Sequence, residues 1–257
     1  MAGHIIKINN KKCIGCGMCA DDCVADNIQL ENGKACVVSN NCIMCGHCVA
    51  VCPKEAVSIS GYETGPIAKN GDILLNPGEV LDVIRFRRSV RQFQDKKIPH
   101  KVLEQILEAG RLAHTAKNMQ DVSFAVLDKE MPVIEQMAVR LFRKMKPFAG
   151  LFSPLVRRHQ IGEHFFFFNA PVVIAVIAKN SVNGALAAQN MEFVAEANGL
   201  GVLYSGYFAA AAKFSRKIRK LMGLSRGQKV VTALVLGYPK ARYLRSAQRE
   251  KLDVKYL

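Results

Sequence analysis

The sequence predicts an α+β protein in which a small cysteine-rich part precedes a larger part of alternating helices and strands. All nine cysteines of the 257-residue chain lie within its first 52 residues, so the two parts differ sharply in composition. Between them, residues 61–78 are rich in Gly, Pro and Asn, which is typical of a turn-rich connector. We therefore expect a first domain at residues 1–60, a linker at 61–78 and a second domain at 79–257.

Eight of the cysteines form two copies of the spacing C-x2-C-x2-C-x3-C. The first copy is Cys13, Cys16, Cys19 and Cys23, and the second is Cys42, Cys45, Cys48 and Cys52. Three thiolates spaced by two residues can hold one face of a cubane, while a fourth, three residues further on, reaches a neighbouring cluster. The spacing therefore predicts two 4Fe-4S clusters.

Zinc and disulfide bonds are weaker explanations of these cysteines. A structural zinc site uses C-x2-C pairs separated by a loop, so the third and fourth cysteines of each run would be surplus. Disulfide bonds would need a secretory context, yet the N-terminal stretch has no apolar run long enough for a signal peptide. We therefore expect a cytoplasmic protein.

Cys36 stands outside both runs, in an apolar stretch, and is expected to be a buried thiol.

The second part of the chain alternates between helical and strand periods. We expect helices at residues 99–113, 131–146, 184–198 and 208–222, and strands at 122–127, 170–178, 202–205 and 230–236. No apolar run approaches the roughly 18 residues needed to span a bilayer, so no membrane partner is expected. The glycine motifs of Rossmann dinucleotide sites and of P-loops are absent from the sequence.

Positive charge is concentrated in the second part. Residues 1–60 carry 5 basic and 5 acidic side chains, so the whole formal net charge of +15 comes from residues 61–257. A basic surface of this kind favours an anionic cofactor, an anionic substrate or an acidic redox protein. No helix-turn-helix, zinc-finger or RNA-binding signature accompanies the charge, so nucleic acid is not expected as a partner.

Residues 1 to about 60 resemble a bacterial-type two-cluster ferredoxin, on the strength of both cysteine runs. The resemblance implies that Cys13, Cys16, Cys19 and Cys52 hold the first cluster, and that Cys42, Cys45, Cys48 and Cys23 hold the second. Pro53 follows Cys52, as the ferredoxin motif expects. Val24 follows Cys23 instead, a departure that bears on the potential of the cluster concerned.

Four segments of the second part, taken in order, resemble the FMN-dependent nitroreductase superfamily. They are residues 87–93, 115–120, 187–190 with 199–201, and 236–239. This resemblance spans residues 80–257 and implies a three-layer α/β/α domain with a mixed, mainly antiparallel sheet. It also implies a homodimer with FMN at the interface between the subunits.

Several residues are implied by this resemblance to bind FMN. Arg87, Arg88, Ser89 and Arg91 would contact the phosphate, the ribityl chain and the pyrimidine edge, while Thr115, Ala116, Asn118 and Gln120 would come from the partner subunit. The backbone N–H groups of Ser205 and Gly206 would lie near the flavin N5. Arg245 and Arg249 are candidates for the phosphate, and Arg242 remains an alternative. Guanidinium groups and backbone donors suit the acceptors of FMN.

Two features bear on the substrate pocket. Many relatives carry Pro-Trp after the residue that corresponds to Gln120, whereas this chain carries Asp121 and Val122 and contains no Trp. We therefore expect a pocket different from that of the nitroaromatic reducers. No residue can be assigned as a catalytic acid or base.

Together the two resemblances imply an FMN-dependent oxidoreductase in which electrons pass through two 4Fe-4S clusters to FMN. The substrate would be a small organic molecule such as a nitro compound, quinone, enone or halogenated compound. Two alternatives stay open: a relay that passes electrons to a protein partner, and another flavin reaction on the same scaffold, such as dehydrogenation or dehalogenation. The sequence leaves open whether the donor is a ferredoxin, a flavodoxin or NAD(P)H.

Overall fold

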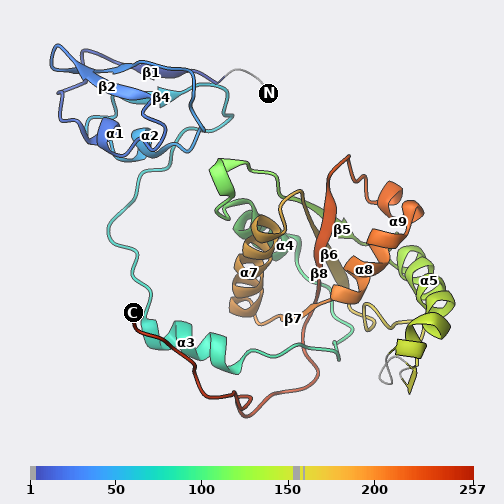
Figure 1. Cartoon of the computed structure of the whole chain (residues 1–257). Helices are drawn as coiled ribbons and strands as arrows, with labels where there is room; N and C mark the ends of the chain where they lie inside the picture. Colours follow the sequence, from blue (N-terminus) through green and yellow to red (C-terminus); the bar gives the residue numbers. More distant parts are fainter. Residues whose placement is uncertain (1–3, 153–156, 159) are drawn as a thin grey trace. The chain divides into compact units, whose positions relative to one another are not determined.

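The structure is a computed structural model that describes residues 4–152, 157–158 and 160–257. The chain divides into two units (Figure 1). The first comprises Met1–Leu74 together with Ala116–Met119, and the second comprises Leu75–Thr115 and Gln120–Leu257. Among the described residues, no helix combines the length and the apolar character needed to cross a membrane.

The first unit contains two small antiparallel sheets and two short helices. Strand β1 (Ile6–Ile8) pairs with β4 (Val57–Ile59), β2 (Ile28–Glu31) pairs with β3 (Lys34–Val37), and the helices are α1 (Met18–Asp21) and α2 (His47–Ala50). Each helix follows a glycine in the left-handed region, Gly17 with φ 82° and Gly46 with φ 77°. Glycine adopts this backbone without strain, so the chain can turn within each cysteine run. The helices then bury Cys19 and Cys48.

The second unit is built on a four-stranded sheet with the order β5-β6-β8-β7. Its strands are β5 (Ser123–Leu127), β6 (Val172–Ala178), β7 (Gly201–Tyr204) and β8 (Lys229–Gly237), and every neighbouring pair is antiparallel. A parallel bridge between Ser89 and Val202 makes the sheet mixed. The four strands lie within two residues of the positions expected from the sequence.

Helices cover both faces of this sheet and produce three layers (Figure 1). They are α4 (His100–Arg111), α5 (Met131–Phe152), α7 (Ser181–Ala197), α8 (Gly206–Phe214) and α9 (Arg216–Leu221). Along β6 the side chains alternate: Val173 and Ala175 pack with α5, α8 and α9, whereas Ile174 and Val176 pack with α4 and α7. The expected α+β class, with a three-layer second domain and a mainly antiparallel sheet, is confirmed.

Four helical segments differ from expectation. Helix α5 ends at Phe152 instead of residue 146, and α7 begins at Ser181 instead of residue 184. The single helix expected at 208–222 is two helices, because Ser215 is extended and its hydroxyl caps α9 by accepting from the N–H of Ile218 at 3.3 Å. Helix α3 (Pro77–Phe86) was not expected, and it begins inside the stretch assigned to the linker. The side chain of Asn76 caps this helix, and Pro77 occupies its first turn, where no N–H is needed.

Candidate functional site

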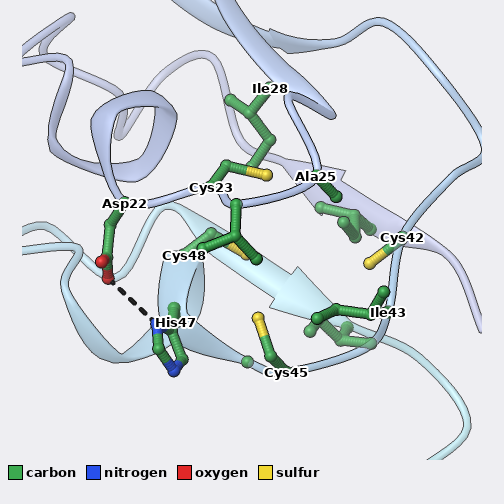
Figure 2. Close-up of a pocket in the computed structure, with 13 residues that line it drawn as sticks. Asp22, Cys23, Ala25, Ile28, Cys42, Ile43, Cys45, His47 and Cys48 are labelled. Atoms are coloured by element: carbon green, nitrogen blue, oxygen red, sulfur yellow. Dashed lines mark ion pairs between the residues drawn. The ribbon is translucent and has the colours of Figure 1, made fainter. Parts of the chain in front are cut away.

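The eight motif cysteines surround two cavities in the first unit. Cys13, Cys16, Cys19 and Cys52 line one of them, and Cys23, Cys42, Cys45 and Cys48 line the other (Figure 2). Each cysteine run therefore contributes its fourth cysteine to the cavity of the other run. These are the same two sets of four that the ferredoxin resemblance implies.

The surroundings of the thiols suit sulfur ligands that carry negative charge. The backbone N–H of Ala35 points at the Sγ of Cys13 at 3.4 Å, and that of Ala56 points at the Sγ of Cys52 at 3.2 Å. In the other cavity, Met44 donates in the same way to Cys42 at 3.3 Å. Such N–H groups stabilise thiolates and the clusters that thiolates bind.

The pKa values of the cysteine thiols indicate how readily each of them loses its proton in these cavities. The N–H groups of Ala35 and Gly15, with the charge of Lys34, lower the pKa of Cys13. Burial and the neighbouring thiols raise the pKa of Cys48 to about 11. Four such thiols can be ionised together only around a positively charged group. Within the described residues, no three His, Cys, Asp or Glu side chains converge as the ligands of a single metal ion do.

Two residues near the cavities are not candidate ligands. Cys36 was expected to be buried, but it is partly exposed because Ala35, its neighbour in β3, takes the inward position of the alternating strand. His47 forms an ion pair with Asp22 at 3.4 Å beside the second cavity, and both side chains are about half exposed (Figure 2).

The second unit contains a cavity of about 340 Å³ dominated by arginines. It is lined by Arg87, Arg88, Ser89, Arg91, Tyr243 and Arg249. None of these lining residues carries a carboxylate, so the four guanidinium groups favour an anionic occupant. Five of the six are residues that the nitroreductase resemblance assigns to FMN.

The segment that carries the first of these arginines is fixed against the edge of the sheet. The N–H of Val90 donates to the carbonyl oxygen of Val202 in β7 at 3.1 Å, and the Val90 side chain is buried. Gly201 makes this close approach possible, because a Cβ there would lie 2.4 Å from a methyl group of Val90. Since side chains alternate along an extended chain, burial of Val90 directs Ser89 and Arg91 to the opposite side.

The C-terminal tail contributes Arg249 and Tyr243 to this cavity. The hydroxyl of Tyr243 donates to the carbonyl oxygen of Ser89 at 3.5 Å. The sequence did not single out Tyr243, because positive charge was the only signal in this stretch. Arg245 and Arg242, the other candidates for the FMN phosphate, are not among the residues that line the cavity.

Arg87 belongs to a buried hydrogen-bond network that is centred on Glu192. The guanidinium of Arg87 forms an ion pair with Glu192 at 2.8 Å, and the Glu192 side chain is 3% exposed. Glu192 also accepts from the amide of Gln189 at 2.8 Å and from the hydroxyl of Tyr204 at 3.2 Å. Burial and the charge of Glu192 raise the pKa of Glu196 to about 7, against the effect of Arg87. Burial, with Glu192 adding to it, also raises the pKa of Tyr204.

One atom of this network lacks a partner. The Nε of Arg87 is buried and has no hydrogen-bond partner among the described residues. A buried donor without an acceptor is costly, and a ligand that carried an acceptor to this atom would remove that cost. FMN, with its phosphate, hydroxyl and ring acceptors, suits both the orphaned donor and the arginine lining.

The residues expected to come from a partner subunit do not line the cavity of their own chain. The hydroxyl of Thr115 accepts from the N–H of Gln120 at 3.0 Å and closes a tight turn. Within it, Lys117, Asn118 and Gln120 have positive φ values of 52°, 50° and 45°. Such backbone costs energy in residues other than glycine and is concentrated at functional sites.

The central residues of this turn, Ala116–Met119, group with the first unit. There the side-chain amide of Asn118 donates to the carbonyl oxygens of Met44 at 2.7 Å and Ile43 at 3.3 Å.

The backbone donors expected near the flavin N5 differ from each other. The N–H of Ser205 donates to the carbonyl oxygen of Ala233 at 2.8 Å, so it is already engaged within the chain. Gly206 is the first residue of α8, where an N–H has no partner within the helix. Of these two residues, Gly206 is therefore the one whose backbone N–H can serve a ligand.

Asp121, which departs from the pattern of many relatives, forms hydrogen bonds within the chain that hold two segments together. Its carboxylate accepts from the backbone N–H groups of Lys179 at 3.1 Å and Asn180 at 2.9 Å, and from the side-chain amide of Asn183 at 2.6 Å. It thereby joins the chain before β5 to the start of α7.

Comparisons with known proteins agree with the two-part organisation. Residues 84–238, which make up more than half of the chain, match the model of the nitroreductase family, and residues 5–53 match that of a 4Fe-4S dicluster domain. Two archaeal relatives share the provisional name NADH dehydrogenase/NAD(P)H nitroreductase. The relative from Methanothermobacter thermautotrophicus is 23% identical over 63% of this chain and 78% of its own length. The relative from Archaeoglobus fulgidus is 27% identical over 63% of this chain and 86% of its own length.

Solved structures share the fold of the second unit. A nitroreductase with bound FMN from Bacteroides fragilis has 23% identity and a TM-score of 0.58, covering 70% of this chain and 98% of that one. Another nitroreductase with bound FMN, from Desulfitobacterium hafniense, has 22% identity and a TM-score of 0.58, covering 72% of this chain and 100% of that one. At these identities the likeness shows the fold.

Proposed function

Because the chain belongs to the nitroreductase family, we propose that it is an FMN-dependent oxidoreductase whose electrons arrive through two 4Fe-4S clusters. The observation that carries this proposal is the presence, on one chain, of two cavities each lined by four cysteines and a third lined by four arginines. The first two suit cubanes, and the third suits an anionic cofactor. Together they provide binding sites for carriers of single electrons and for a carrier of electron pairs.

The cluster sites are assigned by cavity. We propose that Cys13, Cys16, Cys19 and Cys52 bind one 4Fe-4S cluster, and that Cys23, Cys42, Cys45 and Cys48 bind the other. The N–H groups of Ala35, Ala56 and Met44 would hold the thiolates in place and stabilise their charge. The clusters supply one-electron transfer when bound.

The FMN site is assigned to the arginine cavity. Arg88, Arg91 and Arg249 provide positive charge for the phosphate, while Ser89 and Tyr243 close the wall beside it. FMN supplies the exchange between single electrons and electron pairs when bound. The cavity of about 340 Å³ is lined by none of the residues 115–120 that the resemblance also assigns to FMN, which favours completion of the site by other residues.

Those other residues would come from a second copy of the chain. The nitroreductase resemblance assigns Thr115, Ala116, Asn118 and Gln120 to the partner subunit. Helix α3 buries none of its residues, and the apolar side chains of Leu81, Ile84 and Phe86 are 55%, 42% and 46% exposed. Apolar side chains exposed in this number on one helix favour an interface, and a homodimer would cover them.

The substrate class follows from the flavin chemistry. We propose a nitro compound, quinone, enone or halogenated compound, bound over FMN and reduced by an electron pair. The names of the two archaeal relatives include NAD(P)H, so NAD(P)H stands beside ferredoxin and flavodoxin as a candidate donor. A cytoplasmic location accords with thiols that must stay reduced before they bind iron.

A relay to a protein partner is the second candidate function. Residues 197–249 contain eleven Lys and Arg residues and no Asp or Glu. A surface of this composition favours docking of an acidic redox protein. In that case the partner, and not a small molecule, would take up the electrons. Dehydrogenation and dehalogenation remain alternative reactions on the same scaffold.

Anaerobic reduction of the purified protein tests the proposal. The protein would be reduced by a low-potential one-electron donor or by NAD(P)H, and then mixed with small oxidants and, separately, with an acidic ferredoxin or flavodoxin. The proposal expects multiple turnovers with at least one small organic oxidant. Turnover with the protein partner alone would favour the relay. Protein that binds neither iron nor FMN would contradict both functions.

A further inference from the structure

We propose that Glu192 is a positioning residue that holds Arg87 at the FMN site and cancels its charge. The inference rests on the proposed FMN function and deepens it. It assigns two roles to the four arginines of the cavity: Arg87 donates hydrogen bonds to FMN as half of a neutral pair, while Arg88, Arg91 and Arg249 supply the net positive charge.

The geometry of the pair carries the positioning role. A terminal nitrogen of Arg87 donates to Glu192 at 2.8 Å, and this carboxylate lies on α7, 105 residues further along the chain. The guanidinium is planar and rigid, so a contact at one terminal nitrogen fixes the direction of the other donors. Arg87 also lines the cavity, and its Nε is buried without a partner among the described residues. Glu192 thus holds the guanidinium of Arg87 in one orientation at the wall of the cavity.

Glu192 is itself held from more than one side. The amide of Gln189 donates to its Oε2 at 2.8 Å, and the hydroxyl of Tyr204 lies 3.2 Å from the same oxygen while also lying 3.0 Å from the carbonyl oxygen of Ala188. Its Oε1 is left for Arg87. A buried carboxylate that accepts from Gln189 and Arg87 and contacts the hydroxyl of Tyr204 has little freedom to move, so it can serve as a rigid support.

The charge argument follows from burial. Glu192 is 3% exposed and Arg87 is 31% exposed, so water screens their interaction poorly. Their formal charges cancel at the edge of the cavity. Among the described residues, Arg88, Arg91 and Arg249 form no ion pair, so their charge is available to an anion. The dianionic phosphate of FMN would be drawn to these three arginines.

The positioning role is tested by a double-mutant cycle on FMN affinity. Glu192→Ala, Arg87→Ala and the double variant would be compared with the native holoprotein by flavin fluorescence. Each single substitution is expected to raise the dissociation constant about tenfold or more, and the double variant no further than Arg87→Ala alone. Fully additive losses would overturn the role, because Glu192 would then act independently of Arg87.

The charge role is tested by Glu192→Gln. The amide oxygen can still accept from Arg87, so FMN affinity is expected to stay close to that of the native protein. Loss of the negative charge leaves Arg87 as a net cation beside the cavity, and a cation there favours the reduced, more negative flavin. The reduction potential of bound FMN is therefore expected to rise. An unchanged or lowered potential would overturn the charge role.

Glu135→Gln is the matched control. Glu135 is also a buried carboxylate of the second unit, but it accepts from the N–H groups of Phe166 at 3.1 Å and Phe167 at 2.7 Å and does not line the cavity. The substitution Glu135→Gln is expected to lower the stability of the fold while leaving the affinity for FMN and the reduction potential of bound FMN unchanged. Native protein that binds no FMN would overturn both the proposed function and this inference. Native FMN binding that is indifferent to Glu192 would overturn the inference alone.

Discussion

Cys23 belongs to the first cysteine run, yet it lines the same cavity as Cys48 of the second run. In the same way, Cys52 of the second run lines the cavity of Cys13. The two proposed clusters are therefore linked through the chain, because each run would supply ligands to both. This crossed arrangement and an arrangement in which each run binds its own cluster predict the loss of different clusters when Cys23 or Cys52 is replaced.

Substitution of the crossed cysteines should remove the cluster of the opposite run. The native protein should contain about eight iron and eight sulfide per chain. Cys23→Ser should abolish the same low-temperature electron paramagnetic resonance signal as Cys48→Ser, and Cys52→Ser the same signal as Cys19→Ser. Cys36→Ser is the control and should leave the iron content unchanged. Loss of one common signal in Cys23→Ser and Cys19→Ser would contradict the crossed arrangement.

Arg249→Ala should weaken FMN binding. Its guanidinium lines the arginine cavity, and loss of one charge-assisted contact costs roughly 1.5–3 kcal/mol, or about ten- to a hundredfold in affinity. Titration of the apoflavoprotein with FMN measures the change. Lys144→Ala removes an equal charge from an exposed position of α5 and should leave the affinity unchanged. Similar losses in both variants would indicate a general effect of charge.

Much of the fold follows from local patterns in the sequence. The strands were predictable because apolar runs such as Val172–Ala178 form the core of the sheet, and the three-layer arrangement followed from the family resemblance. The break at Ser215 was not predictable, because apolar residues keep a helical period on both sides of it. Helix α3 was missed because the stretch before it has the composition of a linker, although its start signals, Asn76 and Pro77, and the helical spacing of its apolar residues could have predicted it.

The site was predictable where its residues lie close together in the sequence. The cysteine runs and the segment 87–91 carry local signals, and the structure gathers each of them around a cavity. The pair of Arg87 and Glu192 spans 105 residues, so no local pattern could reveal it. Nor could the sequence show that the N–H of Ser205 is engaged by Ala233, since this depends on strand pairing.

A charge placed on the exposed face of α3 should dissociate the proposed homodimer. Leu81→Asp is expected to favour the monomer and to weaken FMN binding, because the site would need residues of both subunits. Sedimentation across a dilution series measures the oligomeric state of the native protein and of the variant. FMN should in turn stabilise the native dimer against dilution, by linkage.

Val133→Asp offers the matched control for this variant. Val133 is an apolar residue of α5 that is 48% exposed, compared with 55% for Leu81. It should leave the dimer intact. A native protein that is monomeric and still binds one FMN per chain would contradict the shared site.

Glu196→Gln should change how stability depends on pH. The folded pKa of Glu196 is raised to about 7, from about 4.3 in an unfolded chain. The folded state therefore binds more protons between these values, so the contribution of Glu196 to stability falls as the pH rises from about 4.3 to about 7. The variant has no such titrating group. The free energy of unfolding of the variant, relative to that of the native protein, should therefore rise by about 1–3 kcal/mol across that window.

Urea denaturation followed by circular dichroism at pH 5.5 and pH 8 measures the difference. Glu130→Gln changes an exposed carboxylate of the same unit and should show no such trend. A constant difference between native protein and Glu196→Gln at the two pH values would contradict the raised pKa.

The central claim is that electrons reach FMN through the clusters, and rapid anaerobic mixing with a low-potential one-electron donor tests it most directly. The native protein should show cluster absorbance bleaching first, followed by bleaching of FMN as the cluster absorbance recovers. A variant that carries both Cys19→Ser and Cys48→Ser but retains FMN should reduce its flavin far more slowly. Equal rates of FMN reduction in the native protein and this variant would contradict the claim.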